Sequence, residues 1–358
     1  MPESRTSIEI RNVYKLFGPH PERYVEAVRD GGMNKAELLE KHNHVLGLSN
    51  VSLDIEAGHI QVIMGLSGSG KSTLIRHINR LIEPTTGEVI VGGTDVRALS
   101  AGELRAFRRT SAAMVFQKFA LLPHRTVLGN VVFGLEIRGV PREAQMETAR
   151  RWIDRVGLAG FEDKYPSQLS GGMQQRVGLA RALANDAPIL LMDEAFSALD
   201  PLIRLDMQAI LLDLQAEVRK TVVFITHDLD EALKIGDRVA IMQDGELVQQ
   251  GRPEDIVLSP ATAYVEDFVR HVNRGRVVKL SALARPESGA PAALRLPAAL
   301  PLADAALRLV EARLSFADVT DGNGAVVGRV DLDDVVRTLA RSTGETAGSN
   351  DPPARLAG

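Results

Sequence analysis

The segment GLSGSGKST stands between an apolar run and an amphipathic one. The preceding HIQVIMG is typical of a buried strand, and the following LIRHINRLI is typical of a helix. Glycines let backbone N–H groups converge on a phosphate, and the N-terminal end of the next helix favours the same anion. The pattern G-x-x-x-x-G-K-[ST] predicts a phosphate-binding loop that contains Gly65, Ser67, Gly68, Ser69, Gly70, Lys71, Ser72 and Thr73.

Two acidic residues end a second apolar run, ILLMDE. In the phosphate loop, Lys71 is expected to neutralise the β and γ oxygens of a triphosphate, and the Ser72 hydroxyl to ligate Mg²⁺. An acid at the carboxyl end of a buried parallel strand lies beside such a loop. We therefore expect Asp193 to hold Mg²⁺ and Glu194 to orient or deprotonate the attacking water.

Two further polar residues follow strand-like runs. His227 follows TVVFIT and can reach a γ-phosphate, and Gln117 follows MVF and can ligate Mg²⁺ or accept a hydrogen bond from water. Taken alone, His227 is better explained as an ordinary loop histidine, and Gln117 alone is only a weak signal. Their positions just past strands are what favour a role beside the phosphate.

The segment LSGG precedes a strong helical pattern, MQQRVGLARALA. Its residues Ser170, Gly171 and Gly172 predict a second anion site at a helix N-terminus. One triphosphate does not need two such sites, but two chains arranged head to tail would use both. A plain helix cap is the alternative interpretation.

The remaining pattern predicts the elements that position these residues. The segments IQVIMG, APILLMDE and TVVFITH lack polar alternation, as strands buried on both faces do. VIVGGTDV and IMQDGELVQQG carry turn signals of hairpins, and helical periodicity follows Pro141 and Pro201. The sum is an α/β fold, with a mixed sheet that has a parallel core and added antiparallel strands.

Composition excludes several classes of protein. The chain has 358 residues, 45% hydrophobic and 25% charged, with a net charge of −4 and no cysteine. These values are ordinary for a soluble globular protein, give no basic nucleic-acid surface, and rule out disulfides and thiolate metal sites. The N-terminus lacks the apolar core of a signal peptide, and no window approaches the ~18 apolar residues of a membrane span.

Two regions fall outside the α/β pattern. Residues 19–46 predict two short helices joined at Gly31 and Gly32, with Asn34 as an N-cap, either as a packed surface insertion or as a docking element. Beyond residue 275, an Ala- and Pro-rich linker leads to a strand, a turn, a strand and a helix. We expect domains at 1–275 and 276–345, and a disordered tail at 346–358.

The motifs GLSGSGKST, LSGGMQQR, ILLMDEAFSALD and VFITHDLDEA, in this order, resemble those of the ATP-binding subunits of ABC transporters. The resemblance implies a P-loop ABC ATPase domain with antiparallel and helical subdomains, and a homodimer that closes around two ATP molecules. It assigns Lys71, Ser72, Asp193 and Gln117 to phosphate and Mg²⁺, Glu194 to the catalytic base, and His227 to the γ-phosphate. The residues that the resemblance assigns to the other chain's ATP are Ser170, Gly171, Gly172 and Asp200. Adenine would stack on Phe17, with Tyr14 as the alternative.

A narrower resemblance is to the subunits that energise glycine betaine and proline betaine import. It rests on EIRNVYKLFG followed by the insertion, and on RHINRLIEPTTGEV, MVFQKFALLPHRTVLGNV and LLMDEAFSALDPLIR. It implies ATP and Mg²⁺ as cofactors, a transmembrane permease and a separate substrate-binding protein as partners, and a peripheral place on the cytoplasmic face of the membrane. Choline or carnitine as cargo, or a non-transport ABC ATPase, are the alternatives.

The C-terminal region resembles one small α+β unit of the CBS (cystathionine β-synthase-like) type, where members of the subfamily often carry two. Gly328 and Asp334 fit the nucleotide-binding pattern of such units, but Asp331 takes the position of a hydroxyl. A carboxylate there would repel a phosphate. A packing or dimer-contact role is therefore favoured over nucleotide sensing.

Overall fold

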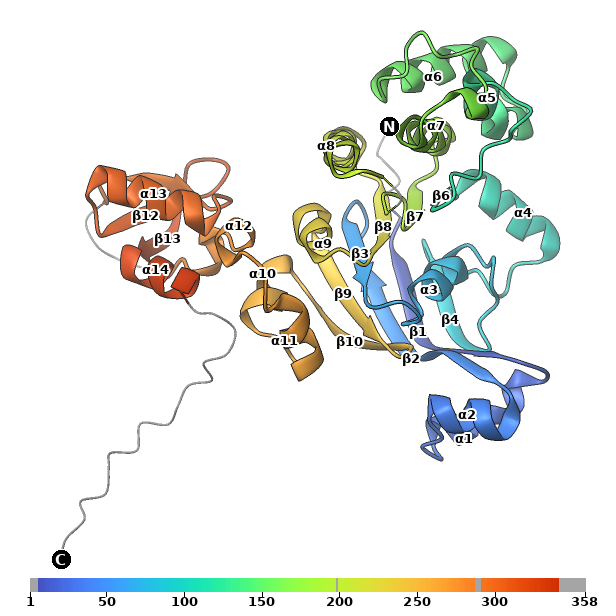
Figure 1. The fold of residues 1–358 in the computed structure, drawn as a ribbon, viewed down its shortest axis with the longest axis horizontal. Helices are drawn as coiled ribbons and strands as arrows, with labels where there is room; N and C mark the ends of the chain where they lie inside the picture. Colours follow the sequence, from blue (N-terminus) through green and yellow to red (C-terminus); the bar gives the residue numbers. More distant parts are fainter. Residues whose placement is uncertain (1–5, 198, 287–290, 341–358) are drawn as a thin grey trace, which may run out of the picture. The chain divides into compact units, whose positions relative to one another are not determined.

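The computed structural model describes residues 6–197, 199–286 and 291–340, in two compact units that meet in sequence at Arg252 and Pro253 (Figure 1). The boundary that the sequence suggests, residue 275, lies inside the second unit. That unit begins with α10 (Pro253–Leu258) and α11 (Ala263–Val269). The segment 346–358, expected to be disordered, lies outside the described residues.

The larger sheet of the first unit has the order β10-β9-β3-β8-β7-β6. Its strands are β3 (Ile60–Met64), β6 (Ala112–Phe116), β7 (Ile189–Asp193), β8 (Thr221–Thr226), β9 (Arg238–Gln243) and β10 (Glu246–Gly251). All but β10 pair in parallel, and β10 returns antiparallel to β9 through Asp244 and Gly245. Strands β3, β7 and β8 are buried along their whole length, which explains their continuous apolar sequence. The predicted parallel core and this hairpin are confirmed.

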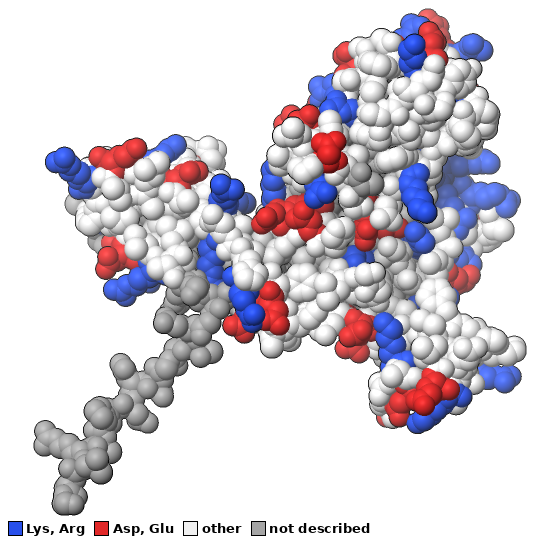
Figure 2. All heavy atoms as spheres, in the orientation of Figure 1, with Lys and Arg blue, Asp and Glu red and all other residues white. Residues whose placement is uncertain are grey.

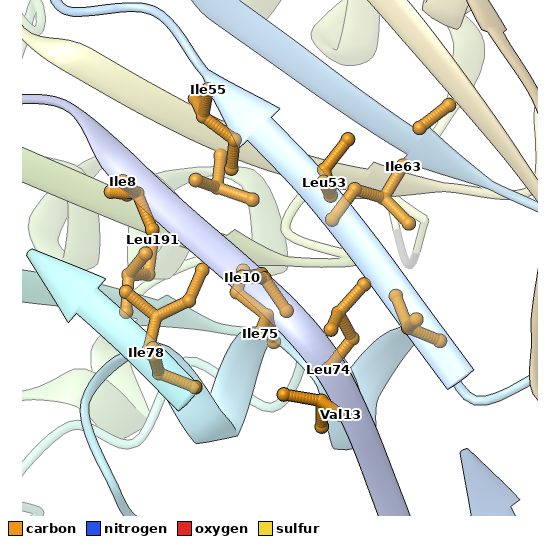
Figure 3. Packing of buried hydrophobic residues seen from close by; sticks show 14 of the residues in the cluster. Ile8, Ile10, Val13, Leu53, Ile55, Ile63, Leu74, Ile75, Ile78 and Leu191 are labelled. Atoms are coloured by element: carbon orange, nitrogen blue, oxygen red, sulfur yellow. The ribbon is translucent and has the colours of Figure 1, made fainter. Parts of the chain in front are cut away.

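A second, antiparallel sheet has the order β2-β1-β4-β5. Its strands are β1 (Ile8–Phe17), β2 (Val45–Ile55), β4 (Thr86–Val91) and β5 (Thr94–Asp95). Helix α3 (Lys71–Ile78) packs its apolar face into the core that this sheet shares with β3 and β7. Figure 3 shows Leu74 and Ile75 of the helix against Ile10 and Val13 of β1. The helix that follows the phosphate loop is thus held from both sheets.

Helices α5 (Val127–Ile137), α6 (Arg142–Arg155) and α7 (Gly171–Ala184) pack on one another as a helical subdomain (Figure 1). Outside the insertion, the unit also contains α4 (Ala101–Thr110), the 3-10 turn η2 (Pro166–Gln168), α8 (Pro201–Val218) and α9 (Leu229–Ile235). Pro201 occupies the first turn of α8, where its missing N–H costs nothing.

The insertion connects β1 to β2 and contains η1 (Pro21–Tyr24), α1 (Val25–Arg29) and α2 (Lys35–His42). Asn34 caps α2 in a capping box with Glu37, as the sequence predicts. The insertion buries Leu38 in a small cluster that includes Tyr14. At its base, the ring nitrogens of His44 lie 2.7 Å from the carbonyl oxygens of Pro19 and His42.

The second unit holds a three-stranded sheet, β11-β12-β13, covered by short helices. Its further elements are α12 (Arg274–Val277), η3 (Leu280–Ala282), β11 (Arg295–Pro297), α13 (Leu302–Ala312), β12 (Phe316–Thr320), β13 (Val326–Asp331) and α14 (Leu332–Ala340). The predicted strand, turn, strand and helix are confirmed. Inside the unit, Arg329 donates to the buried Asp318 at 2.8 Å.

The surface carries both signs of charge. On the face drawn in Figure 2, lysines and arginines are interspersed with aspartates and glutamates. Among the residues that the structure describes, none of the helices combines the length and apolar character needed to span a bilayer.

The buried residue His77 should make the free energy of unfolding depend on pH. His77 on α3 is fully buried, and this burial, with the nearby Lys15 charge, lowers its pKa from 6.5 to about 3. The buried neutral ring contributes its full stability to the fold above pH 6.5. This stability is lost as the pH falls toward 3, because the unfolded chain binds a proton at this histidine more readily than the folded chain does. From pH 6.5 to about pH 5, we expect the free energy of unfolding to fall by about 2 kcal/mol.

Denaturant titrations at these two pH values measure the effect. His77→Leu should remove this part of the pH dependence, since leucine does not titrate. An unchanged pH dependence in the variant would assign the effect to other groups.

Candidate functional site

The phosphate loop, residues 65–73, joins β3 to α3 with a backbone that favours glycine. Gly68 and Gly70 have φ of 78° and 99°, and a Cβ at Gly65 would lie 2.2 Å from the Met242 carbonyl oxygen. Gly70 caps α3 without any side-chain hydrogen bond, so the first N–H groups of the helix keep no side-chain partner there. The Ser69 hydroxyl is buried and has no hydrogen-bond partner among the described residues. The uncapped start of α3 suits an anionic ligand.

Lys71 lies folded into this loop and is 5% exposed. Its Nζ donates to the carbonyl oxygens of Gly65 at 2.8 Å and of Leu66 at 3.0 Å. Burial lowers the pKa of the Lys71 ammonium, and the nearby carboxylates of Glu194 and Asp193 oppose that shift. The ammonium is thus aimed at the centre of the loop, where a phosphate would lie.

Asp193 ends β7 directly beside the loop. Its Oδ1 accepts from the Ser72 hydroxyl at 2.8 Å, and its Oδ2 accepts from Arg76 at 2.9 Å. A hydroxyl and a carboxylate at this spacing form a donor set of the kind that Mg²⁺ prefers, because both are hard oxygen ligands. The two residues that the sequence assigns to Mg²⁺ at this strand end are in contact.

Glu194 lies at the meeting point of two other predicted residues. Its Oε2 accepts from the Gln117 amide at 3.0 Å and lies 3.8 Å from the Nδ1 of His227. Strands β6, β7 and β8 are neighbours in the sheet, which is why three residues far apart in sequence converge. Glu194 itself has φ of 47°, a strained conformation for a residue with a side chain.

The two aromatic candidates differ in exposure. Phe17, at the end of β1, is 38% exposed, and Lys15 places its Nζ 4.9 Å from the ring centre. Tyr14 is 5% exposed and packs inside the cluster of the insertion. Only Phe17 of this pair has a ring face open to a ligand.

Ser170 and Asp200 cap the two neighbouring helices α7 and α8. The Ser170 hydroxyl accepts from Met173 N at 3.3 Å, and the Asp200 carboxylate accepts from Ile203 N at 3.2 Å. A Cβ at Gly172 would lie 2.6 Å from Ile203, so the two helix starts approach closely. In the described part of the chain, Ser170 and Asp200 bond within their own helices and not to the phosphate loop.

Three residues of this site were not predicted from the sequence. Arg76, one helical turn after Ser72, pairs with Asp193, and helical spacing could have found it. Ser197 lies 3.4 Å from the Gln117 amide, which the motif ILLMDEAFS alone does not indicate. Gly245 donates from its backbone N–H to the Ser69 carbonyl oxygen at 3.1 Å, a contact that only the folded hairpin reveals.

Comparisons with known proteins agree with this geometry. The family model described as ABC transporter matches residues 48–197. The chain is 48% identical, over 97% of its length and 86% of the relative, to the glycine betaine/proline betaine transport system ATP-binding protein ProV of Escherichia coli. It is 52% identical, over 79% of its length and 71% of the relative, to the glycine betaine/carnitine transport ATP-binding protein GbuA of Listeria monocytogenes.

Among solved structures, the dimeric structure of MJ0796, a bacterial ABC transporter cassette, is similar with a TM-score of 0.59 and 34% identity. The similarity covers 69% of this chain and 98% of that cassette. The chain is 48% identical to a relative of which it covers 86%, and its phosphate loop contacts a strand-end carboxylate. It is therefore an ABC ATPase, an ATP-binding protein of the ABC transporter family.

Proposed function

We propose that the chain hydrolyses ATP to energise import of glycine betaine, proline betaine or related quaternary amines through a membrane permease. The observation that carries the cargo assignment is the 48% identity to ProV over 97% of the chain. The name of GbuA supports carnitine as a second cargo. Nothing in the phosphate site would touch the solute, which we assign to the permease and to a substrate-binding protein.

The phosphate loop would hold the triphosphate of ATP. Lys71 and the N-terminal N–H groups of α3 would neutralise the β and γ oxygens. Ser72 and Asp193, with Gln117, would hold Mg²⁺, which supplies positive charge that stabilises the phosphate oxygens. The 2.8 Å contact of Ser72 with Asp193 supports this pairing.

Glu194 is assigned as the base that takes the proton from the attacking water. A carboxylate beside the γ-phosphate position can accept that proton, and His227 at 3.8 Å from Oε2 would orient the water and the γ-phosphate. In this structure the Gln117 amide donates a hydrogen bond to Oε2 of Glu194 at 3.0 Å. When the attacking water also donates to Oε2, the amide either keeps this hydrogen bond beside the water or moves away.

The second anion site is assigned to the ATP of a second copy of this chain. Gly171 and Gly172 open α7, whose N-terminal N–H groups favour a phosphate, and Asp200 lies beside them on α8. The MJ0796 cassette was solved as a dimer, which supports a homodimer here. Hydrolysis would then depend on dimer closure, and closure would move the permease. Such a complex places the chain at the cytoplasmic face of the membrane.

A hollow near Gln117 suits contact with the permease. This cavity of about 380 Å³ lies where β6 and α4 meet α5 and α7. Apolar side chains form much of its lining, with Phe116, Leu122, Phe133 and Ile137 among them. A partner side chain that entered it would press on the segment after Gln117.

Replacing Phe17 with alanine should raise the KM for ATP about tenfold with little change in kcat, because base stacking is worth about 1–3 kcal/mol. Steady-state hydrolysis over a range of ATP concentrations measures it. Tyr14→Leu removes the ring of the alternative residue and should leave KM unchanged, since Tyr14 is buried. A rise in KM with Tyr14→Leu and not with Phe17→Ala would reverse the assignment.

The proposed function is tested by ATP-driven uptake of radiolabelled glycine betaine into proteoliposomes. The complex would contain this chain, its permease and its binding protein, with Glu194→Gln as the inactive control. Uptake that requires ATP and is lost in the control supports the proposal. ATP hydrolysis without uptake of glycine betaine would reject this cargo, and carnitine and choline would be measured in the same vesicles.

A further inference from the structure

Arg76 is a charged residue beside the phosphate loop that none of the roles assigned above uses. It lies on α3, one helical turn after Ser72, so both side chains leave the same face of the helix. Its Nη2 lies 2.9 Å from Oδ2 of Asp193. Among the described residues, its guanidinium makes no other hydrogen bond or ion pair. The side chain is thus directed at one carboxylate.

The carboxylate of Asp193 is divided between two donors of α3. Its Oδ1 accepts from the Ser72 hydroxyl at 2.8 Å, and its Oδ2 accepts from Arg76 at 2.9 Å. The backbone of Asp193 is fixed in β7, which pairs with β6 on one side and β8 on the other. The Asp193 side chain is 5% exposed, so little water is at hand to replace a lost partner. The remaining freedom of this side chain, rotation of the carboxylate, is limited by the two contacts with α3.

The hydrogen bond from Arg76 decides which oxygen of Asp193 faces the proposed metal position. Ser72 and Oδ1 of Asp193 form the donor pair assigned above to Mg²⁺. Groups that hydrogen-bond to metal ligands orient those ligands, and their loss typically costs about 10- to 100-fold in metal affinity. With Oδ2 bonded to Arg76, Oδ1 stays directed at Ser72. Without Arg76, the carboxylate is free to turn away from the position that Ser72 shares.

The positive charge of Arg76 also has an opposite effect, because a cation repels a metal ion nearby. Two observations favour orientation over repulsion. Arg76 bonds to Oδ2 and leaves Oδ1 to Ser72, so the guanidinium does not occupy the oxygen that faces the metal position. Its side chain is 41% exposed, so solvent and salt screen its charge.

We propose that Arg76 is a positioning residue for the metal: it holds Oδ2 of Asp193 so that Oδ1, together with Ser72, receives the Mg²⁺ that accompanies ATP. The inference rests on the proposed function, because it needs Ser72 and Asp193 as metal ligands. Helix α3 would then have two tasks. Its N-terminal end favours the phosphates, and its second turn orients the carboxylate that serves the metal.

Binding of a fluorescent ATP analogue by the full chain, in EDTA and in Mg²⁺, measures this role without hydrolysis. Arg76→Met should leave the affinity in EDTA unchanged and remove most of the additional affinity that Mg²⁺ gives the wild type. In hydrolysis assays, it should raise the Mg²⁺ concentration that gives half the maximal rate about 10- to 100-fold, and excess Mg²⁺ should restore most of the rate. Arg76→Lys keeps one charged donor and should recover most of the wild-type dependence on Mg²⁺.

Arg329→Met is the matched control. Arg329 donates to Asp318 at 2.8 Å, and the Asp318 side chain is also 5% exposed, but this pair belongs to the second unit. Breaking it should lower thermal stability without changing how ATP binding and hydrolysis depend on Mg²⁺.

Three results would overturn the inference. A loss of ATP affinity in EDTA with Arg76→Met would place the guanidinium on the phosphates themselves. A lower half-activating concentration of Mg²⁺ would show that Arg76 repels the metal, and a concentration equal to that of Arg329→Met would leave Arg76 without a role. Wild-type protein that does not hydrolyse ATP, or hydrolyses it equally well in EDTA, would reject the proposed function itself, whatever the Arg76 variants do.

Discussion

Replacing Glu194 with glutamine is expected to reduce ATP hydrolysis by about 10²- to 10⁴-fold, the usual contribution of a general base, while ATP still binds. Glutamine has the same length, and its amide oxygen can still accept the hydrogen bond that Gln117 now makes at 3.0 Å. Lys71 and the loop N–H groups are untouched, so affinity is retained. Phosphate release and equilibrium binding of a fluorescent nucleotide measure the two quantities separately.

A matched control exists on α9. Glu231 accepts from the Gln208 amide at 3.1 Å, much as Glu194 accepts from Gln117, and it is 5% exposed. Glu231→Gln therefore makes the same chemical change in a buried amide contact and should leave hydrolysis close to the wild-type rate. A Glu194→Gln enzyme as active as this control would move the search for the base to His227.

Replacing Lys71 with methionine is expected to abolish tight ATP binding as well as hydrolysis. A fall in kcat/KM of about 10²- to 10⁴-fold follows from losing charge-assisted hydrogen bonds worth about 1.5–3 kcal/mol each. The loop also loses the bonds from Nζ to the Gly65 and Leu66 carbonyl oxygens. Binding by titration calorimetry and hydrolysis under the same conditions give both effects.

Lys220 is the control for that variant. It is a lysine of similar burial, with its side chain 10% exposed, and its Nζ donates to the Ala187 carbonyl oxygen at 2.9 Å. Lys220→Met should cost stability without changing affinity for ATP. If both lysine variants lose binding equally, the loss reports unfolding and not contact with phosphate, and thermal denaturation would show it.

Sequence patterns predicted the parallel core and the strand-end residues because both depend on local rules. A strand buried on two faces needs an uninterrupted apolar run, and the carboxyl ends of neighbouring parallel strands bring Asp193, Glu194 and His227 to one edge. The capping box at Asn34 is likewise local, since its two hydrogen bonds span three residues. The assignments of these residues to ATP and Mg²⁺ stay predictions until binding is measured.

The features of the site that were not predicted from the sequence depend on contacts between distant segments. The unpaired Ser69 hydroxyl and the Gly245 contact with the loop depend on the folded hairpin and on burial, which one-dimensional spacing does not report. The left-handed backbone at Phe119 and Ala120, with φ of 57° and 47°, had no signal either, because neither residue type favours that conformation. Arg181 of α7, 61 residues further along the chain, donates to the Ala120 carbonyl oxygen, a contact that spacing within the segment does not report.

The insertion between Phe17 and Val45 also bears on the order in which the chain folds. These two residues are paired in register across β1 and β2, as the ends of a tight hairpin would be. With the insertion between them, the two strands must pair across a long loop instead of a short turn. The free-energy cost of closing that loop is higher by about 2 kcal/mol, at about 0.6 kcal/mol per doubling of length. The Asn34–Glu37 capping box and the buried Leu38 give the insertion order of its own, which shortens the flexible length that must close. Early formation of α2 would therefore speed the pairing of the strand that carries Phe17.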